Sequence, residues 1–222
     1  MCAPSRNSLL TSRRPDTLRL YDFYSYWRDF VGNFTTLPQY FKEHGYETRA
    51  IGKVFHPGAS SNSTDDFPYS WTNVPYHPST EAFMNEPVCP NRKLGTFETK
   101  VICPVELCYQ PEGTLPDIQS LAQAETILSA TRTRPLFLAV GFHKPHIPFR
   151  VPREFYHLHR IDKFRRPDFD HIPYGMPTSA FNPFLDIRER SDAQRQSIPF
   201  PFGPVPRRFG ERLRQAYYSS VT

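Results

Sequence analysis

A continuous apolar run behind an amphipathic segment is the feature that most limits the fold of this chain. Residues 136–140, Leu-Phe-Leu-Ala-Val, carry no polar side chain and stand between Pro135 and Gly141. Residues 115–131, just before them, place apolar side chains at intervals of three and four, which predicts a helix with one buried face. A buried strand that follows a helix is typical of a parallel sheet covered by helices. The chain is therefore expected to belong to the α/β class.

The rest of the chain predicts a second such unit between long loops. Thr36 can cap a helix over residues 36–44, and residues 47–54 are expected to form a strand after it. The 24 prolines among 222 residues are about twice the usual share. Because they are spread along the chain, we expect ordered Pro-rich loops over residues 57–114 and 160–206. A basic amphipathic helix is expected after these loops, over residues 207–220.

Composition excludes several classes of protein. Hydrophobic residues make up 38% of the chain and aromatic residues 15%, so a disordered chain is not expected. No apolar run approaches the roughly 20 residues of a membrane helix. The net charge of +5 fits an anionic substrate as well as it fits a mildly basic surface. No zinc finger or RNA-binding motif accompanies this charge, so we expect no nucleic-acid partner.

The start of the chain carries the first group of chemically suited side chains. Residues 2–6 are Cys-Ala-Pro-Ser-Arg, and Pro4 suits the first turn of a short helix over residues 4–13. The free N–H groups of such a helix start favour an anion, such as sulfate or phosphate, and also a thiolate. Arg6, about one helical turn beyond Cys2, could neutralise a nucleophile there. The alternative is a thiol without a chemical role.

Two further groups follow the predicted strands. The first strand ends at Lys53 and His56, and His143 comes after the apolar strand. Ligands of open α/β sheets bind at the carboxyl ends of the strands, so these side chains are candidates for one site. His143 and His146 also have the spacing of a zinc-binding pair, but no third ligand is evident. Solvated or structural histidines are the other alternative.

Cysteines and sequons bear on the compartment. The four cysteines are Cys2, Cys89, Cys103 and Cys108. If Cys2 is modified, one of the other three must be unpaired or bonded elsewhere. Cys89 and Cys103 could close a loop of about 15 residues, which would stabilise the fold by about 3 kcal/mol. Asn33 and Asn62 stand in Asn-x-Ser/Thr sequons, the acceptor pattern for N-glycosylation in the secretory pathway.

Three motifs resemble those of the sulfatase family. The first is the Cys-x-Pro-Ser-Arg of residues 2–6. The second is residues 52–58, Gly-Lys-Val-Phe-His-Pro-Gly, and the third is residues 142–150, Phe-His-Lys-Pro-His-Ile-Pro-Phe-Arg. They stand in the family's order. The resemblance implies an alkaline-phosphatase-like α/β domain with a mostly parallel sheet flanked by helices and long Pro-rich loops.

The resemblance also implies a role for each motif. Cys2 would be oxidised by the formylglycine-generating enzyme, and the resulting formylglycine would be the nucleophile and a ligand of Ca²⁺. Arg6 would neutralise its charge, and His56 would orient its hydroxyl group. Lys53 and His143 would bind the sulfate group, and His143 would also protonate the leaving oxygen.

Further segments narrow the resemblance to one branch of the family. They lie over nearly the whole chain, at residues 13–17, 21–23, 111–117, 182–183 and 186–188. That branch works in the lysosome and removes 2-O-sulfate from iduronate, so a sulfated glycosaminoglycan such as heparan or dermatan sulfate is implied as substrate. Asp65 and Asp66 stand in a loop near the uronate, and either of them, Asp66 in the first place, is a candidate substrate contact. The two sequons and a Cys89–Cys103 disulfide also fit this branch.

The departures from the family pattern limit what the resemblance implies. Ser12 stands where the extended signature usually has glycine, and Cys108 is an additional thiol. We find no signal peptide, no upstream Asp pair and no downstream calcium ligands in the sequence. We therefore expect residues 1–222 to be a partial sulfatase catalytic domain, without its first core strand and C-terminal part, and inactive or weak by itself. Alternatives are another sulfatase, a phosphonate or phosphate ester hydrolase of the same superfamily, or a non-catalytic truncated paralogue.

Overall fold

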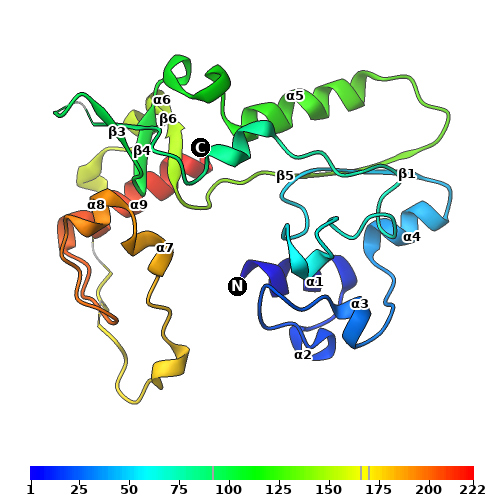
Figure 1. Ribbon diagram of the computed structural model, residues 1–222, viewed down its shortest axis with the longest axis horizontal. Helices are drawn as coiled ribbons and strands as arrows, with labels where there is room; N and C mark the ends of the chain where they lie inside the picture. The colour runs from blue at the N-terminus through cyan, green and yellow to red at the C-terminus, as the bar shows by residue number, and fades with distance from the viewer. Residues whose placement is uncertain (92, 166, 170) are drawn as a thin grey trace. The chain divides into compact units, whose positions relative to one another are not determined.

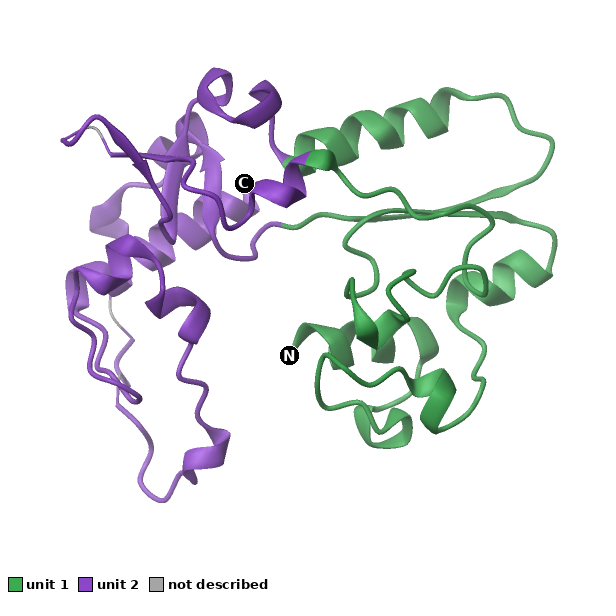
Figure 2. Cartoon of the chain, viewed as in Figure 1, with its two compact units in different colours: residues 1–79, 116–143 green, residues 80–115, 144–222 purple. Residues whose placement is uncertain are grey.

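The chain folds into two compact units with separate cores. The computed structural model (Figure 1) describes residues 1–91, 93–165, 167–169 and 171–222. Unit 1 consists of residues 1–79 and 116–143, and unit 2 consists of residues 80–115 and 144–222 (Figure 2). Each unit contains one pair of parallel strands and its own buried clusters. The chain therefore builds two local scaffolds, which are described one after the other.

A parallel strand pair forms the centre of unit 1. Strand β1 (Glu47–Gly52) pairs with β5 (Leu136–Gly141) along its whole length. Helix α4 (Leu37–Glu43) precedes β1, and helix α5 (Pro116–Ser129) precedes β5. In Figure 1, α5 lies on one side of the strands and the helices α1 to α4 lie on the other. The two helix–strand units predicted from the sequence, and with them the α/β class, are confirmed.

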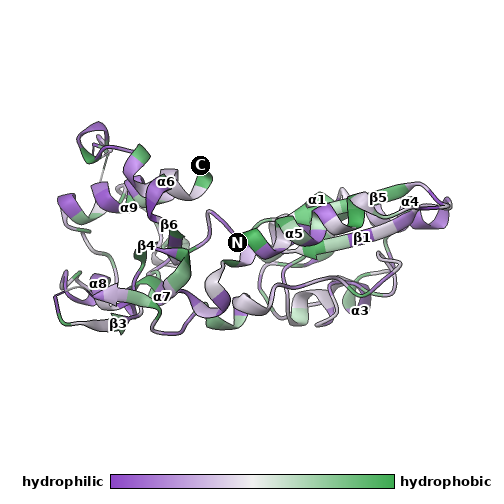
Figure 3. Ribbon diagram, turned by 90° about the horizontal axis from the view of Figure 1, so that it is seen from above, coloured by the Kyte–Doolittle hydropathy of each residue, from purple (hydrophilic) through white to green (hydrophobic). Residues whose placement is uncertain are grey.

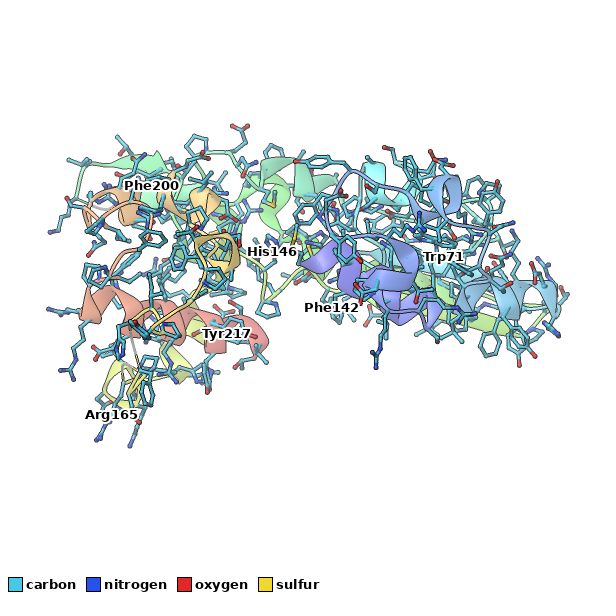
Figure 4. All side chains as sticks on the ribbon, turned by 90° about the horizontal axis from the view of Figure 1, so that it is seen from below. Trp71, Phe142, His146, Arg165, Phe200 and Tyr217 are labelled. Atoms are coloured by element: carbon cyan, nitrogen blue, oxygen red, sulfur yellow. A yellow bond between two sulfur atoms is a disulfide. The ribbon has the colours of Figure 1, made fainter. Side chains whose placement is uncertain are left out.

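Apolar side chains from both sides of the strands fill the core of unit 1. One cluster joins Leu10 of helix α1 (Cys2–Thr11) to Ala50 of β1 and to the buried rings of Phe55 and Trp71. These two rings pack edge to face, with centroids 6.2 Å apart. A view from below shows Trp71 among the side chains of this unit (Figure 4). The core thus fixes α1 and the loop after β1 to the same strand.

A second cluster belongs to the short helices that connect α1 to α4. Helix α2 (Pro15–Leu18) supplies Leu18, and helix α3 (Trp27–Phe30) supplies Trp27. Both side chains are essentially inaccessible to solvent. These helices therefore belong to the folded core and are more than surface loops.

Unit 2 is built around a second parallel pair. Strand β4 (Ile102–Val105) pairs with β6 (Phe149–Pro152), and helix α9 (Arg207–Val221) packs against both. Phe209 and Ala216 of α9 contribute to the buried cluster. Figure 3 colours many residues of α9 as hydrophilic, whereas the residues of β5 in unit 1 are hydrophobic. Helix α9 confirms the amphipathic helix expected over residues 207–220.

The loop-rich region expected over residues 57–114 contains more regular structure than predicted. An antiparallel pair of β2 (Cys89–Asn91) and β3 (Thr96–Glu98) precedes β4. These strands have three or four residues each, and two of them contain proline, so no apolar alternation marks them in the sequence. The region is rich in loops as expected, and its three short strands were not predicted.

The other long loop region is closer to the prediction. Helix α6 (Arg153–Leu158) precedes it, and within residues 160–206 helices α7 (Leu185–Arg188) and α8 (Ser191–Gln194) have four residues each. Short 3₁₀ turns complete the described chain, at Ala59–Ser61, Ser79–Phe83, Leu107–Tyr109, Pro111–Gly113, Ile161–Lys163 and Thr178–Ala180. Within the part of the chain that the structure describes, the strands lie in three two-stranded sheets, two of them parallel. None of the described helices has the length and apolar character needed to cross a membrane.

Candidate active site at the strand ends of unit 1

The first turn of α1 holds the half-buried Cys2 side chain. The helix begins at Cys2, two residues earlier than predicted, and ends at Thr11. Ser12 then takes a left-handed conformation with φ 54°, which glycine adopts without strain but which costs another residue about 1 kcal/mol. Serine at this position therefore still ends the helix where the family signature has glycine, at a small cost in stability.

Arg6 joins this helix to the loop that follows β1. Its guanidinium group donates to the carbonyl oxygen of Lys53 and, at 3.2 Å, to that of Val54. Burial lowers the pKa of Arg6, while the nearby Cys2 and Asp65 raise it in part. The Cys2 side chain therefore lies within electrostatic range of the guanidinium. Two segments that the sequence singled out separately are thus held together by one half-buried cation.

Two glycines bring the ends of β1 and β5 into close contact. Gly52, with φ +65°, stands opposite Gly141 in the strand register. A Cβ on Gly52 would lie 2.4 Å from the Gly141 oxygen, and a Cβ on Gly141 would lie 2.1 Å from the Lys53 oxygen. The Lys53 N–H donates to the Gly141 oxygen at 2.7 Å. A side chain at either glycine would separate the strand ends, so this contact fixes the backbone of Lys53.

The loop that carries Lys53 and His56 is held by both its backbone and its side chains. Lys53 is buried, with 7% of its surface exposed. The His56 ring packs against Phe23, with ring centroids 4.8 Å apart. The backbone carbonyl oxygen of His56 accepts from the Ser61 hydroxyl at 2.8 Å. Because charges interact more strongly where water is excluded, the Lys53 ammonium is well placed to act on an anion.

Asp117 positions His143 at the end of β5. The backbone N–H of His143 donates to Asp117 Oδ1 at 2.7 Å, and the ring Nδ1 lies 3.6 Å from the same oxygen. The 3.6 Å separation is longer than a hydrogen bond, so Asp117 fixes the backbone of His143 and places a carboxylate near its ring. Sequence reasoning gave Asp117 no role. Its only signal was its place in the first turn of the helix that precedes the strand.

A second acidic group, which the sequence singled out only as an alternative to Asp66, lies close to Arg6. Asp65 is buried, and its Oδ2 lies 2.6 Å from His77 Nε2. Its other oxygen accepts from Ser61 at 3.3 Å. Asp65 is the carboxylate whose charge acts on the Arg6 guanidinium. Because its partners come from other parts of the loop, no local pattern could have separated it from Asp66.

Asp66 has a different environment from the one expected. Its carboxylate is fully buried and binds the Arg28 guanidinium through two contacts, of 2.6 Å and 2.8 Å. The hydroxyls of Tyr26 and Ser70 also donate to it, and burial followed by the bond to Asp66 raises the pKa of Tyr26. This environment accounts for Asp66 as an anchor of the α3 segment. A contact between Asp66 and substrate stays a prediction without support from this geometry.

The described residues do not fit a calcium site. Within residues 1–91, 93–165, 167–169 and 171–222, no group of three or more His, Cys, Asp or Glu side chains could hold a metal ion. Calcium takes 6–8 oxygen ligands, and Cys2 alone would supply a small part of such a set. The zinc alternative at His143 and His146 also finds no third ligand in this part of the chain.

The predicted disulfide and sequons have clear positions. Cys89 and Cys103 form a disulfide bond, with their Cα atoms 5.5 Å apart, while Cys108 is an exposed thiol. Asn33 and Asn62 are both exposed, as a glycosylated asparagine must be. Glycosylation of these two residues stays a prediction.

Known proteins share both the sequence and the fold of this chain. A family model described as Sulfatase matches residues 1–221. Iduronate 2-sulfatase of Mus musculus is 52% identical and that of Homo sapiens 53% identical, each over 100% of this chain and 40% of the relative. The chain thus spans about two fifths of the length of these relatives. Phosphonate monoester hydrolase from Silicibacter pomeroyi has a similar fold, with a TM-score of 0.62 and 17% identity over 100% of this chain and 47% of that structure.

Proposed function

The chain belongs to the sulfatase family, and we propose that it forms part of the catalytic domain of a sulfuric ester hydrolase. The names of the similar mouse and human proteins support 2-O-sulfated iduronate as the substrate. The substrate would then be a sulfated glycosaminoglycan such as heparan or dermatan sulfate. A lysosomal location of the whole protein belongs to the same proposal.

One observation carries the proposal. Arg6 of α1 binds the carbonyl oxygens of the loop that contains Lys53, and β1 and β5 end side by side at Gly52 and Gly141. A thiol at a helix start, a buried ammonium and an imidazole are therefore carried by segments that contact one another. Cationic groups around an oxyanion and a proton donor for the leaving alcohol are what cleavage of a sulfate ester requires.

Cys2 would act as formylglycine, the modified residue that sulfatases generally use together with a divalent metal. One hydroxyl of the hydrated aldehyde attacks sulfur and loses its proton, while the bond from sulfur to the sugar oxygen breaks. The second hydroxyl then loses its proton, the carbon–oxygen bond to the bound sulfate breaks, and the aldehyde forms again. Water adds to the aldehyde and restores the hydrate. An unmodified serine has no second hydroxyl for this release and would depend on attack by water.

The neighbouring side chains have complementary roles in this proposal. Lys53 holds a sulfate oxygen, and His56 orients the formylglycine hydroxyl. His143 protonates the sugar oxygen as it leaves, and Asp117 holds the backbone of His143. Arg6 balances the charge that develops near the nucleophile. No step is assigned to calcium, because the described residues do not form its site.

The test is the chemical state of Cys2. Residues 1–222 would be produced together with the formylglycine-generating enzyme, and the Cys2 peptide would be analysed by mass spectrometry. We expect an aldehyde at Cys2 in the parent and in a Cys108→Ser control, and none in Cys2→Ser. An intact thiol in every molecule of the parent would overturn the proposal.

The alternative is a phosphate or phosphonate ester hydrolase, which the shared fold with a phosphonate monoester hydrolase favours. Parallel assays with an aryl sulfate, an aryl phosphate and a 2-O-sulfated iduronate disaccharide separate the two. We expect weak turnover at most from this chain, because its described residues do not complete a calcium site. Faster cleavage of the phosphate ester than of both sulfate esters would favour the alternative.

A further inference from the structure

Unit 2 contains a cavity that the proposed function does not use. Its volume is about 320 Å³, at the lower end of the range for sites that hold a small molecule. It lies between β4, the start of α6, the α8 segment and α9, and all of its lining residues belong to unit 2. None of them is a member of the candidate active site.

The lining of this cavity is rich in cations. Four basic side chains and one acidic side chain, Asp192, reach it; the basic ones are Lys100, Arg153, Arg195 and Arg212. Both oxygens of Asp192 already accept from backbone N–H groups, those of Val101 at 2.8 Å and Ile102 at 3.0 Å. The single lining carboxylate is therefore engaged in holding β4 and offsets the cations only in part.

Acidic neighbours balance three of these cations, since Glu106 lies 3.3 Å from Arg153 and Glu98 is shared by two others. Glu98 lies 3.0 Å from Arg195 and 3.5 Å from Lys100. Hydrogen bonds from Asn91 and then Arg195 lower the pKa of Glu98 to about 2, so it is ionised at neutral pH. Arg195 and Lys100 share the one carboxylate of Glu98. Their combined positive charge therefore exceeds its negative charge, and the excess faces the cavity.

Arg212 is the cation best placed to meet a ligand. It is exposed on α9 and donates a side-chain hydrogen bond to Tyr156, a neutral group. In the described part of the chain, no carboxylate forms a salt bridge with Arg212. A guanidinium without a carboxylate partner at the edge of a cavity can form a two-point contact with an incoming carboxylate or sulfate.

The remaining lining residues indicate what kind of anion fits. Ile102 and Phe209 are each 97% buried and form an apolar floor, and Gln196 offers an amide. A sugar residue combines an apolar ring face, hydroxyl groups and an anionic substituent, and so matches this lining.

We propose that this cavity binds an acidic sugar residue, with a carboxylate or sulfate group, of a glycosaminoglycan chain. Arg212 and Arg195 contact its anionic group, and the floor of Ile102 and Phe209 contacts its ring. The choice of a glycosaminoglycan rests on the proposed function, whereas the preference for an anion rests on the cavity alone.

The test is a titration of residues 1–222 with a heparan sulfate oligosaccharide, followed by calorimetry at physiological ionic strength. Arg212→Gln removes the cavity cation that lacks a carboxylate partner, and Arg208→Gln removes an exposed charge from the same helix outside the cavity. We expect Arg212→Gln to weaken binding by about 10-fold, the effect of losing one charge-assisted hydrogen bond. Arg208→Gln is expected to weaken it less than about 2-fold, because surface charges are screened by salt.

Three results would overturn the proposal. The first is equal weakening by Arg208→Gln and Arg212→Gln, which would indicate attraction by general surface charge. The second is binding of inorganic sulfate as tight as that of the oligosaccharide, or equal binding of an uncharged dextran. The third is the absence of any binding of the oligosaccharide by the parent chain when its thermal unfolding is cooperative and shows that it is folded. Cys2→Ser, which cannot form formylglycine, is expected to bind like the parent, so failure of the proposed chemistry and failure of this site are distinguishable.

Discussion

Replacement of Gly141 by alanine tests whether the glycine contact fixes the candidate site. The new Cβ would lie 2.1 Å from the Lys53 carbonyl oxygen and 2.3 Å from its carbonyl carbon, whereas ordinary contacts begin at 3.4 Å. The strand ends must then separate by about 1 Å, which also weakens the Lys53 N–H bond to Gly141. Overpacking and the lost hydrogen bond together cost about 2 to 4 kcal/mol.

The assay uses the natural fluorophores of unit 1. The chain has two tryptophans, Trp27 and Trp71, and both are buried in this unit. Urea unfolding followed by tryptophan fluorescence therefore reports the stability of unit 1. Gly210→Ala in unit 2 is the control for the same substitution outside unit 1. Its Cβ would lie no closer than 3.9 Å to Val205, so the fluorescence midpoint should not change.

A free energy of unfolding within about 0.5 kcal/mol of the parent, the usual range for harmless substitutions, would refute the reasoning for Gly141→Ala. A loss of the expected size has a second consequence. A displacement of about 1 Å at a catalytic group can lower a rate by about 100-fold, so the same variant should impair any sulfate ester cleavage that the parent shows.

Three further predictions concern stability. Ser12→Gly should raise the free energy of unfolding by about 1 kcal/mol, since glycine adopts the left-handed conformation at φ 54° without strain, and the fluorescence assay would show this as a higher urea midpoint. Asp66→Asn should lower it by about 3 to 5 kcal/mol, because the buried Arg28 loses its charged partner; an unchanged midpoint would contradict the role of Asp66 as an anchor. The folded-state pKa of Glu98 is lowered to about 2, so its contribution to unit 2 is complete above its unfolded pKa near 4.5 and is lost as the pH falls toward 2. Circular dichroism at several pH values should show a shallower loss of unfolding midpoint in Glu98→Gln than in the parent.

The sequence predicted those parts of the fold that a local pattern encodes. Helix α5 has apolar side chains at intervals of three and four, and strand β5 after it is a continuous apolar run. Both were predicted correctly. Strands β2 to β4 have too few residues for a period and contain prolines. Strands β2 and β3 pair with each other nearby in the sequence, with Cys89 opposite Glu98, whereas β4 pairs with the distant β6, with Ile102 opposite Phe149, which no local window contains.

In the candidate site too, some residues could be predicted from the sequence and others could not. Cys2, Lys53, His56 and His143 stand in contiguous motifs, and their order along the chain identified them. Asp117 acts through a contact with a residue that lies 26 positions away, and such a contact follows from the tertiary fold alone. Asp66 was singled out because the resemblance places its loop near the uronate. Its partner Arg28 lies 38 positions away, and this buried ion pair could not be deduced from the loop sequence.

The division of each unit into two chain segments has a consequence for folding during synthesis. Strand β1 ends at Gly52 and its partner β5 begins 84 residues later, at Leu136, after the first segment of unit 2 has been made. At ordinary rates of translation β1 therefore stays without its partner for on the order of 10 s. During that time its unpaired edge is exposed to aggregation, so a chaperone that binds the nascent chain before Leu136 emerges should raise the yield of folded protein.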